Sequence, residues 1–253
     1  MTGRLASKVV LVTGGGTGIG RAVAARAAAD GAAVVIGGRR QDVGERAATE
    51  LREGGGRAVF VASDVTVEAD VARLVETAVR EFGRLDAAFN NAGGVAATGP
   101  VHARSGQDWR ADLDQNLTSV FYSLKFQIPA IAAAGGGSIV NNASIGGVRG
   151  IAGMSGYVAA KHGVVGLTRS AALEGAGRGV RVNALVTGNA DTPLYRRLIG
   201  APAEGDLPGP APNPTGRVAG PEEIAAFVAF LFSDEAAFIT GAALAIDGGS
   251  TAQ

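Results

Sequence analysis

Cysteine is absent from the chain, and histidine occurs only at His102 and His162. Without thiols the protein can form neither a disulfide, nor a thiolate nucleophile, nor a cysteine-ligated metal site. Two histidines also argue against a histidine-built metal centre. We therefore expect no structural or catalytic metal ion.

Long hydrophobic runs are missing as well. No segment reaches the ~18 uninterrupted apolar residues of a membrane-spanning helix, and the apolar stretch near the N-terminus is too short for a signal peptide. An excess of charge is also missing, because 23 basic side chains balance 23 acidic ones. We expect a soluble, cytoplasmic protein that binds neither nucleic acid nor a membrane.

The remaining composition is that of a folded protein, since 47% of the 253 residues are hydrophobic and 18% are charged. Short β-branched runs alternate with amphipathic stretches such as residues 68–82 and 108–131, which is typical of βαβ units. The runs are nearly continuously apolar, as expected for strands covered on both faces. The expected strands are residues 8–13, 33–37, 57–62, 87–90, 137–142, 180–185 and 242–246.

A chain of this length can form one α/β domain or two small ones. The alternation continues to the end without a linker, so we expect residues 1–253 to form a single domain around a parallel, doubly wound sheet. Residues 200–216 break the pattern with five prolines and no periodicity. Long irregular segments are often functional lids, and ligands of such sheets bind beyond the carboxyl ends of the strands. We expect a substrate lid at about residues 188–220, with a flexible surface loop as the alternative.

A glycine-rich turn, TGGGTGIGR, follows the first expected strand and leads into a helix. Its glycines at positions 14, 18 and 20 do not match the strict G-x-G-x-x-G fingerprint, and it lacks the Gly-Lys-Ser/Thr ending of a P-loop. Glycines in such a turn let the backbone approach a pyrophosphate at the positive end of the helix dipole. The turn therefore indicates a dinucleotide site.

The end of the second expected strand bears on the choice of dinucleotide. It reads Gly37-Gly38-Arg39-Arg40, with no carboxylate until Asp42. NAD sites commonly place an acid here for the ribose hydroxyls, whereas the planar guanidinium of arginine suits the 2′-phosphate of NADP. We expect NADP(H) to be preferred and NAD(H) to remain usable. The alternative is that the two arginines merely begin a solvated helix.

The stretch SGYVAAKHG places Tyr157 and Lys161 four residues apart in an expected helix, hence on one face. Neither side chain is a useful acid near neutrality without perturbation, because their usual pKa values are about 10 and 10.4. A nearby ammonium favours the tyrosinate, so we expect Lys161 to lower the pKa of Tyr157 toward the working pH.

In this order and spacing, the motifs resemble those of the short-chain dehydrogenase/reductase (SDR) family over essentially the whole chain, including its 3-oxoacyl reductase-like and carbonyl reductase or alcohol dehydrogenase members. The matching segments are TGGGTGIG at 13–20, Asp64-Val65, NNAG at 90–93, Asn116 in DQNLTSVF, Ser144 in NNASIGG, Tyr157 and Lys161 in YVAAK, and the closing TGAALAIDGG.

The resemblance implies a seven-stranded Rossmann fold, commonly assembled as a homotetramer or dimer. It implies a catalytic tetrad of Asn116, Ser144, Tyr157 and Lys161. In addition to Tyr157 and Lys161, the implied cofactor contacts are Gly14, Gly16, Thr17, Gly18, Ile19, Gly20, Arg39, Asp64, Val65, Asn91, Ala92, Gly93, Gly188, Ala190 and Thr192.

The resemblance also implies a reaction, in which hydride passes between nicotinamide and a carbonyl carbon while Tyr157 donates a proton to the oxygen. Ser144 would stabilise that oxygen, Lys161 would hold the nicotinamide ribose, and Asn116 would help hold a relay water. We expect an oxidoreductase acting on the carbonyl or secondary alcohol of a small, fairly apolar substrate. The alternatives are an NAD-dependent dehydrogenase of a sugar or sterol alcohol and a nucleotide-sensing protein without catalysis.

Several positions depart from the family pattern. Thr187-Gly188 stands where many relatives have Pro-Gly, and Thr17 where many have a basic residue, which weakens the NADP inference. Residues 131–138 contain no basic side chain, so carrier-bound acyl substrates rank below free ketones and alcohols. Arg149 either meets an anionic substrate or, as we favour, faces solvent. The expected substrate walls are Gly94, Val95, Gly146, Val148, Asn189, Leu194 and Tyr195.

Overall fold

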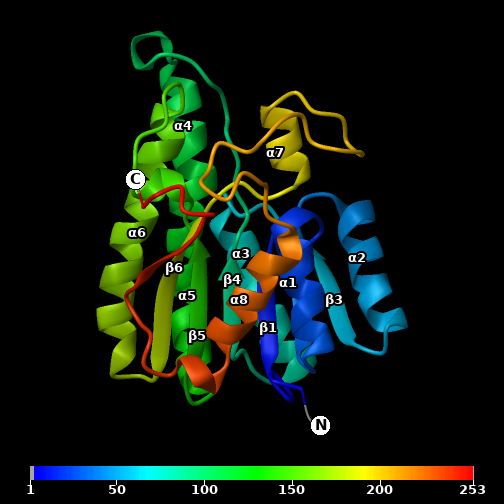
Figure 1. Ribbon diagram of the computed structural model, residues 1–253. Helices are drawn as coiled ribbons and strands as arrows, with labels where there is room; N and C mark the ends of the chain where they lie inside the picture. The colour runs from blue at the N-terminus through cyan, green and yellow to red at the C-terminus, as the bar shows by residue number, and fades with distance from the viewer. Residues whose placement is uncertain (1–2, 253) are drawn as a thin grey trace.

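The computed structural model describes residues 3–252 and contains a seven-stranded, all-parallel sheet with the order β3-β2-β1-β4-β5-β6-β7 (Figure 1). Because sequence neighbours β3 and β4 lie on opposite sides of β1, the strand order reverses beside β1. The strands are Val9–Thr13, Ala33–Gly38, Arg57–Ala62, Ala87–Asn90, Gly137–Asn142, Val180–Thr187 and Ala243–Ile246, numbered β1 to β7. This topology confirms the expected doubly wound Rossmann sheet.

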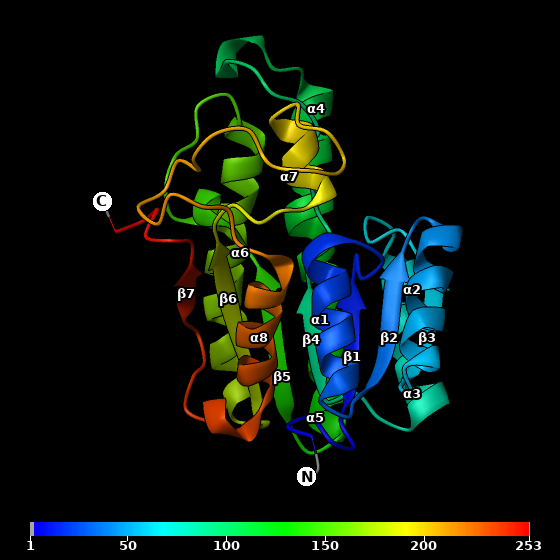
Figure 2. The same cartoon turned by 45° about the vertical axis from the view of Figure 1, so that its right-hand side comes forward.

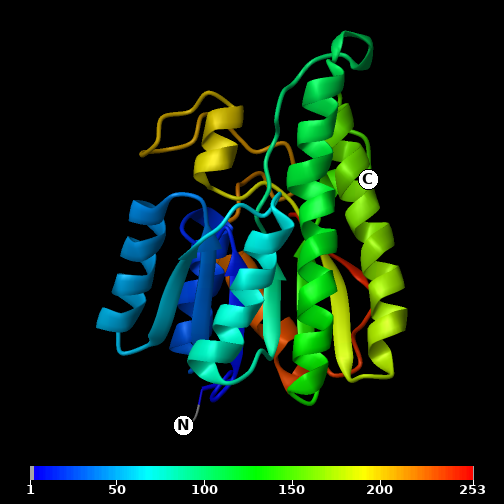
Figure 3. The same cartoon turned by 180° about the vertical axis from the view of Figure 1, so that it is seen from behind.

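Helices cover both faces of the sheet. The front face in Figure 1 carries α1 and α8, which pack against each other, with α2 beside them. The view from behind shows α3, α5 and α6 on the other face (Figure 3). The helices are α1 Gly18–Ala29, α2 Gln41–Glu53, α3 Glu68–Phe82, α4 Gly106–Leu113, α5 Ser119–Ala133, α6 Ser155–Ala176, α7 Pro193–Leu198 and α8 Pro221–Phe232.

The two faces of β1 show why the strands are continuously apolar. All five residues of β1 are buried. Val10 and Val12 pack in the core layer beneath α1 and α8, whereas Val9 and Leu11 pack in the layer beneath α3 and α5. A strand with helices on both faces is therefore apolar at nearly every position, and the exception in β1 is Thr13 at its carboxyl end.

The expected helical pattern at 108–131 differs in detail from the structure. It is a continuous helical stretch, but α4 and α5 are joined by a π-helical segment, Asp114–Thr118. Such bulges insert a residue, rotate the following side chains and often occur at functional sites. Here the segment contains Asn116, whose side chain is fully buried.

The irregular segment lies above the carboxyl edge of the sheet, with α7, as Figures 1 and 2 show. Its two ends meet in a short parallel bridge between Ala190 and Ala219. Between these two residues the chain extends away from the sheet, and it comes back to the sheet edge just before α8 begins. Among residues 3–252, no helix is both long and apolar enough to cross a lipid bilayer.

Candidate active site

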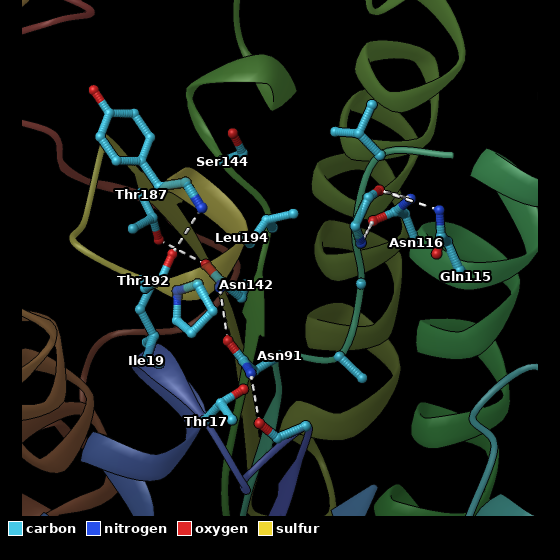
Figure 4. Close-up of a pocket in the computed structure, with 18 of the residues that line it drawn as sticks. Thr17, Ile19, Asn91, Gln115, Asn116, Asn142, Ser144, Thr187, Thr192 and Leu194 are labelled. Atoms are coloured by element: carbon cyan, nitrogen blue, oxygen red, sulfur yellow. Dashed lines mark hydrogen bonds between the residues drawn. The ribbon is translucent and has the colours of Figure 1, made fainter. Parts of the chain in front are cut away.

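A cavity of about 740 Å³ opens at the carboxyl edge of the sheet and extends from the glycine turn to the irregular segment. It is formed by strand ends and loops that are far apart in the sequence, and a close-up shows part of its wall (Figure 4). Every residue predicted for catalysis or cofactor binding lines this cavity except Gly20. The sequence motifs therefore converge on one site.

The glycine turn fits a pyrophosphate. Gly14 and Gly18 have φ of +66° and +54°, which other residues rarely adopt. Helix α1 begins at Gly18, its N-cap Thr17 makes no side-chain cap, and its first turn contains no acid. The first N–H groups and the positive end of the helix dipole thus remain available beside the cavity, which is the arrangement that binds phosphate.

Gly20 has a packing role instead of a place in the cavity wall. A Cβ at this position would lie 2.3 Å from the carbonyl oxygen of Gly14 and 2.7 Å from Nδ2 of Asn91. Only glycine therefore lets α1 approach the turn this closely.

The part of the cavity beyond the ends of β2 and β3 suits an adenosine. Arg39 and Arg40 line it after β2, and Asp64 and Val65 line it after β3. In the described part of the chain, neither arginine forms an ion pair with a carboxylate. Both guanidinium groups are therefore free to meet an anionic ligand group.

Three of the four tetrad residues approach one another beside the end of β5. Tyr157 and Lys161 lie on α6, and the Lys161 ammonium is 5.5 Å from the centre of the tyrosine ring. Lys161 Nζ donates to the backbone carbonyl of Asn142 at 2.7 Å. Ser144 has φ of +124°, a strained conformation for serine, and its Oγ accepts from the backbone N–H of Gly146 at 3.1 Å. Such strain in a folded protein is often found at functional sites.

The expected lowering of the Tyr157 pKa is wrong, because the pKa is raised. Desolvation raises the pKa of Tyr157, the charge of Asp112 raises it further, and the hydrogen bond with Ser144 opposes both. Burial also lowers the pKa of Lys161, to about 8. Because water is excluded around both groups, each is shifted toward its neutral form.

Asn116 is held in place by three hydrogen bonds. Its Oδ1 accepts from Gly94 N at 3.1 Å, and its Nδ2 donates to the carbonyl oxygens of Gly94 at 2.9 Å and Asp112 at 2.8 Å. The π-helical segment turns this amide toward the loop after β4, as Figure 4 shows. Asn116 thereby fixes the part of the cavity wall formed by Gly94.

The lid residues have structural partners of their own. Thr192 Oγ1 accepts from Tyr195 N at 3.1 Å and so caps α7 (Figure 4). Ala190 forms one side of the bridge that closes the base of the irregular segment. Gly188 approaches Asp247 so closely that a Cβ would lie 2.6 Å from its Cα.

The expected substrate walls are partly correct. Gly94, Val95, Asn189, Leu194 and Tyr195 line the cavity, whereas Gly146 and Val148 do not. Several apolar wall residues had no individual signal in the sequence, because the fold alone brings their segments over the cavity. These residues are Ile145, Ile151, Met154, Leu198, Ile199 and Pro212.

Several polar wall residues were not predicted, namely Ser63, Thr66, Gln115, Asn142 and Thr187. Asn142 and Thr187 line the cavity at the ends of β5 and β6, where the rule that ligands bind at the carboxyl ends of strands could have identified them. Arg149 is exposed to solvent, as we favoured, and it also lines the cavity. It is tethered by a hydrogen bond from Nη1 to the carbonyl oxygen of Ser250, 2.7 Å away.

Comparisons with known proteins agree with this geometry. A family model described as enoyl-(acyl carrier protein) reductase matches residues 14–251. The cis-4-hydroxycyclohexanecarboxylate dehydrogenase of Sinomonas cyclohexanicum is 47% identical over 250 residues, 98% of each chain. The cyclohexanol dehydrogenase of Acinetobacter sp. (strain SE19) is 42% identical over 253 residues, 100% of this chain and 98% of the relative. The structure of carveol dehydrogenase from Mycobacterium avium in complex with NAD superposes with a TM-score of 0.92 at 29% identity, covering 100% of both chains.

The fold, the glycine-rich turn and these relatives define an oxidoreductase that uses a nicotinamide dinucleotide. The chain belongs to the short-chain dehydrogenase/reductase family, as its motifs predicted. It is an NAD(P)-dependent enzyme acting on CH–OH and C=O groups, and the alternative of a sensor without catalysis is set aside.

Proposed function

We propose that the enzyme interconverts a small cyclic secondary alcohol and its ketone, with NADP(H) as the preferred cofactor. One observation carries the proposal: Ser144, Tyr157 and Lys161 share a cavity with a largely apolar substrate wall. A saturated ring can pack against such a wall without burying an unpaired polar group of the substrate. The names of the relatives that act on cyclohexanol and on a hydroxycyclohexanecarboxylate support the same substrate class.

Each tetrad residue has a task in the reducing direction. Bound nicotinamide supplies the hydride. Tyr157, which is protonated at neutral pH, donates a proton to the carbonyl oxygen. Ser144 donates a hydrogen bond to that oxygen as charge develops on it. Lys161 holds the nicotinamide ribose, and Asn116 orders the wall at Gly94 and helps hold a relay water.

The cofactor contacts follow the cavity from end to end. We assign the pyrophosphate to the turn and to the first N–H groups of α1, the adenosine to the region of Asp64 and Val65, and the nicotinamide to the tetrad end. The contacts proposed for these three parts are those predicted from the sequence, except that Gly20 acts by allowing close packing.

The preference for NADP(H) rests on Arg39. The strand that precedes it ends in glycine, and no carboxylate at that strand end competes for the guanidinium. A charge-assisted hydrogen bond contributes about 1.5–3 kcal/mol. We therefore expect Arg39→Ala to weaken NADPH binding about 10- to 100-fold and NADH binding less than threefold, as measured by titration of each nucleotide. Equal loss for both nucleotides, or tighter NADH binding by the wild type, would refute the preference and favour the NAD-dependent alternative.

The substrate class is tested by the decay of nicotinamide absorbance. Cyclohexanone, substituted cyclohexanones, linear ketones and β-keto esters would be compared at saturating NADPH and then at saturating NADH. We expect kcat/KM to be highest for the cyclic ketones, and Tyr157→Phe to lower kcat about 10²- to 10⁴-fold. A clear preference for linear substrates would contradict the cyclic assignment and leave the reaction class intact.

We also retain three proposals on organisation: a single domain over residues 1–253, a substrate lid at 188–220, and a cytoplasmic homotetramer or dimer. Light scattering of the purified protein measures the assembly directly. A monomeric mass at micromolar concentration would contradict the proposed oligomer.

A further inference from the structure

A chain of side-chain hydrogen bonds links four strand ends beneath the tetrad. Thr187 Oγ1 at the end of β6 lies 2.6 Å from Oδ1 of Asn142 at the end of β5. Asn142 Nδ2 lies 3.0 Å from Oδ1 of Asn91, which follows β4. Asn91 Nδ2 lies 3.2 Å from the carbonyl oxygen of Thr13 at the end of β1 and 3.5 Å from that of Gly14. Figure 4 shows Thr187, Asn142 and Asn91 of this chain along the cavity wall.

The carbonyl oxygens at one end determine the direction of every bond. A backbone carbonyl can only accept, so the Asn91 group that faces Thr13 and Gly14 must be its NH₂. The other side of that amide, Oδ1, then accepts from the NH₂ of Asn142. Asn142 consequently presents Oδ1 to Thr187, and the threonine hydroxyl must donate its only hydrogen there.

This constraint turns the Thr187 hydroxyl into an acceptor toward the cavity. Its hydrogen is donated to Asn142, whereas the oxygen still has a lone pair that can accept a hydrogen bond. Thr187 lines the cavity and is only 6% exposed. The same Asn142 accepts the Lys161 ammonium on its backbone carbonyl at 2.7 Å. The acceptor therefore lies at the tetrad end of the cavity.

The ligand group that fits is an N–H donor held next to the reacting carbonyl. Hydride transfer requires the nicotinamide ring to lie against the carbon whose oxygen is held by Tyr157 and Ser144. The carboxamide of that ring carries two N–H donors. We propose that Thr187 is a cofactor-binding residue whose hydroxyl oxygen accepts a hydrogen bond from the nicotinamide carboxamide. The inference rests on the proposed placement of nicotinamide at the tetrad end.

The hydroxyl is the feature that matters at position 187. Proline, which many relatives carry there, would leave Asn142 Oδ1 without its donor and would offer no side-chain acceptor. Valine has nearly the shape of threonine but removes the hydroxyl, and serine keeps it. Thr187→Val and Thr187→Ser therefore form a matched pair.

The test measures binding to three ligands by calorimetry, so it does not depend on turnover. The first is the oxidised dinucleotide that the wild type binds more tightly. The second is its 3-acetylpyridine analogue, in which a methyl ketone replaces the carboxamide and no N–H remains. The third is the matching ADP-ribose or its 2′-phosphate, which lacks the ring.

We expect Thr187→Val to weaken the dinucleotide about fivefold, the loss of about one hydrogen bond, and to change the other two ligands less than twofold. Thr187→Ser should bind all three ligands like the wild type. Equal weakening of all three by Thr187→Val, or none, would overturn the proposal and limit Thr187 to a structural role. If the valine variant does not fold, Thr187→Ala gives the same comparison, because a water can pair with Asn142. A wild type that binds none of the ligands would instead refute the dinucleotide site itself.

Discussion

Burial shifts the two titratable residues of the site toward their neutral forms. The pKa of Tyr157 is raised and that of Lys161 falls to about 8. A neutral phenol is the form that can protonate a carbonyl oxygen, so Tyr157 has the form that reduction needs at neutral pH. Oxidation of an alcohol needs the tyrosinate instead, and we expect its rate to increase with pH.

The same burial makes Lys161 costly for stability. Its usual pKa is 10.5 in the unfolded chain and about 8 in the folded protein, so the unfolded state binds more protons between these values. The resulting penalty is about 3 kcal/mol at pH 7, decreases as the pH rises through this window, and disappears above 10.5. Lys161→Met loses one hydrogen bond to Asn142 as well as the charge.

We therefore predict that Lys161→Met is inactive and yet about 2 kcal/mol more stable than the wild type at pH 7, with a smaller difference at pH 9.5. Urea denaturation at both values measures this. The exposed Lys125, paired with Glu68 on the surface, is the control, and Lys125→Met should show no such pH dependence. A Lys161→Met variant less stable than the wild type at pH 7 would contradict the prediction.

Ser144 stores strain in its backbone as well as presenting a hydroxyl. Its φ of +124° costs about 1–3 kcal/mol for a residue other than glycine. Ser144→Ala and Ser144→Gly both remove the hydroxyl, but only glycine relieves the strain. We predict that both variants lose activity about 10²- to 10³-fold, and that the glycine variant is about 1 kcal/mol the more stable. Denaturation curves that coincide for the pair would show that the backbone here is unstrained.

At the scale of elements, a buried ion pair joins α4 to the loop after β4. Arg104 Nη2 lies 2.7 Å from Asp112 Oδ2, and the two side chains are only 7% and 0% exposed. Asp112 Oδ1 also accepts from Ala96 N at 2.8 Å, while Nε of Arg104 is buried without a partner in the described residues. A Cβ at Gly156, next to Tyr157, would lie 2.6 Å from Asp112. The pair thus lies where the loop after β4, α4 and the start of α6 meet.

Removing one member of this pair should be far more damaging than removing both. We predict that Asp112→Asn costs about 3–5 kcal/mol because it leaves a buried guanidinium uncompensated, and that Arg104→Met with Asp112→Leu recovers most of this loss. The exposed pair of Lys125 and Glu68 serves as control, since Glu68→Gln should cost less than about 1 kcal/mol. Urea denaturation of these variants measures their free energies of unfolding. A double variant as unstable as Asp112→Asn would contradict the prediction. Asp112→Asn should also lower the pKa of Tyr157, because the charge of Asp112 raises that pKa.

At the scale of the whole molecule, the side chain of Arg196 makes several of the contacts that hold the proposed lid in place. Arg196 binds Asp191 through Nε at 2.6 Å and through Nη2 at 2.7 Å, and it donates to the carbonyl oxygens of Pro202 and Gly205, each at 2.9 Å. These contacts fold the irregular segment back onto α7 above the cavity. Most of the segment is otherwise exposed.

We predict that Arg196→Met increases the rate of cleavage after Glu204 by a glutamate-specific protease several-fold and raises KM more than it lowers kcat. Arg197→Met is the control, since Arg197 lies next to Arg196 but forms no ion pair in the described part of the chain. In the wild type, saturating dinucleotide and substrate should slow the cleavage, because a closed lid excludes the protease. Identical cleavage of the two variants would show that Arg196 does not hold the segment.

Much of the fold follows from patterns that are local in the sequence. Four consecutive apolar residues between Lys8 and Thr13 predict β1, and the amphipathic stretch at 68–82 predicts α3 with its observed bounds. The glycine turn and the four-residue spacing of Tyr157 and Lys161 are equally local. These features depend on backbone geometry and helical period, which near neighbours in the chain determine.

The sequence by itself therefore determined the order of strands and helices, the dinucleotide turn, the SDR family and the reaction class. Only the tertiary structure decided the direction of the Tyr157 pKa shift, the burial of Asp112 and the hydrogen bonding of Thr187. Thr187 and Asn142 are 45 residues apart in sequence, and Asn142 and Asn91 are 51 apart. Desolvation and hydrogen-bond direction depend on which distant groups surround a side chain, and the folded chain alone brings those groups together.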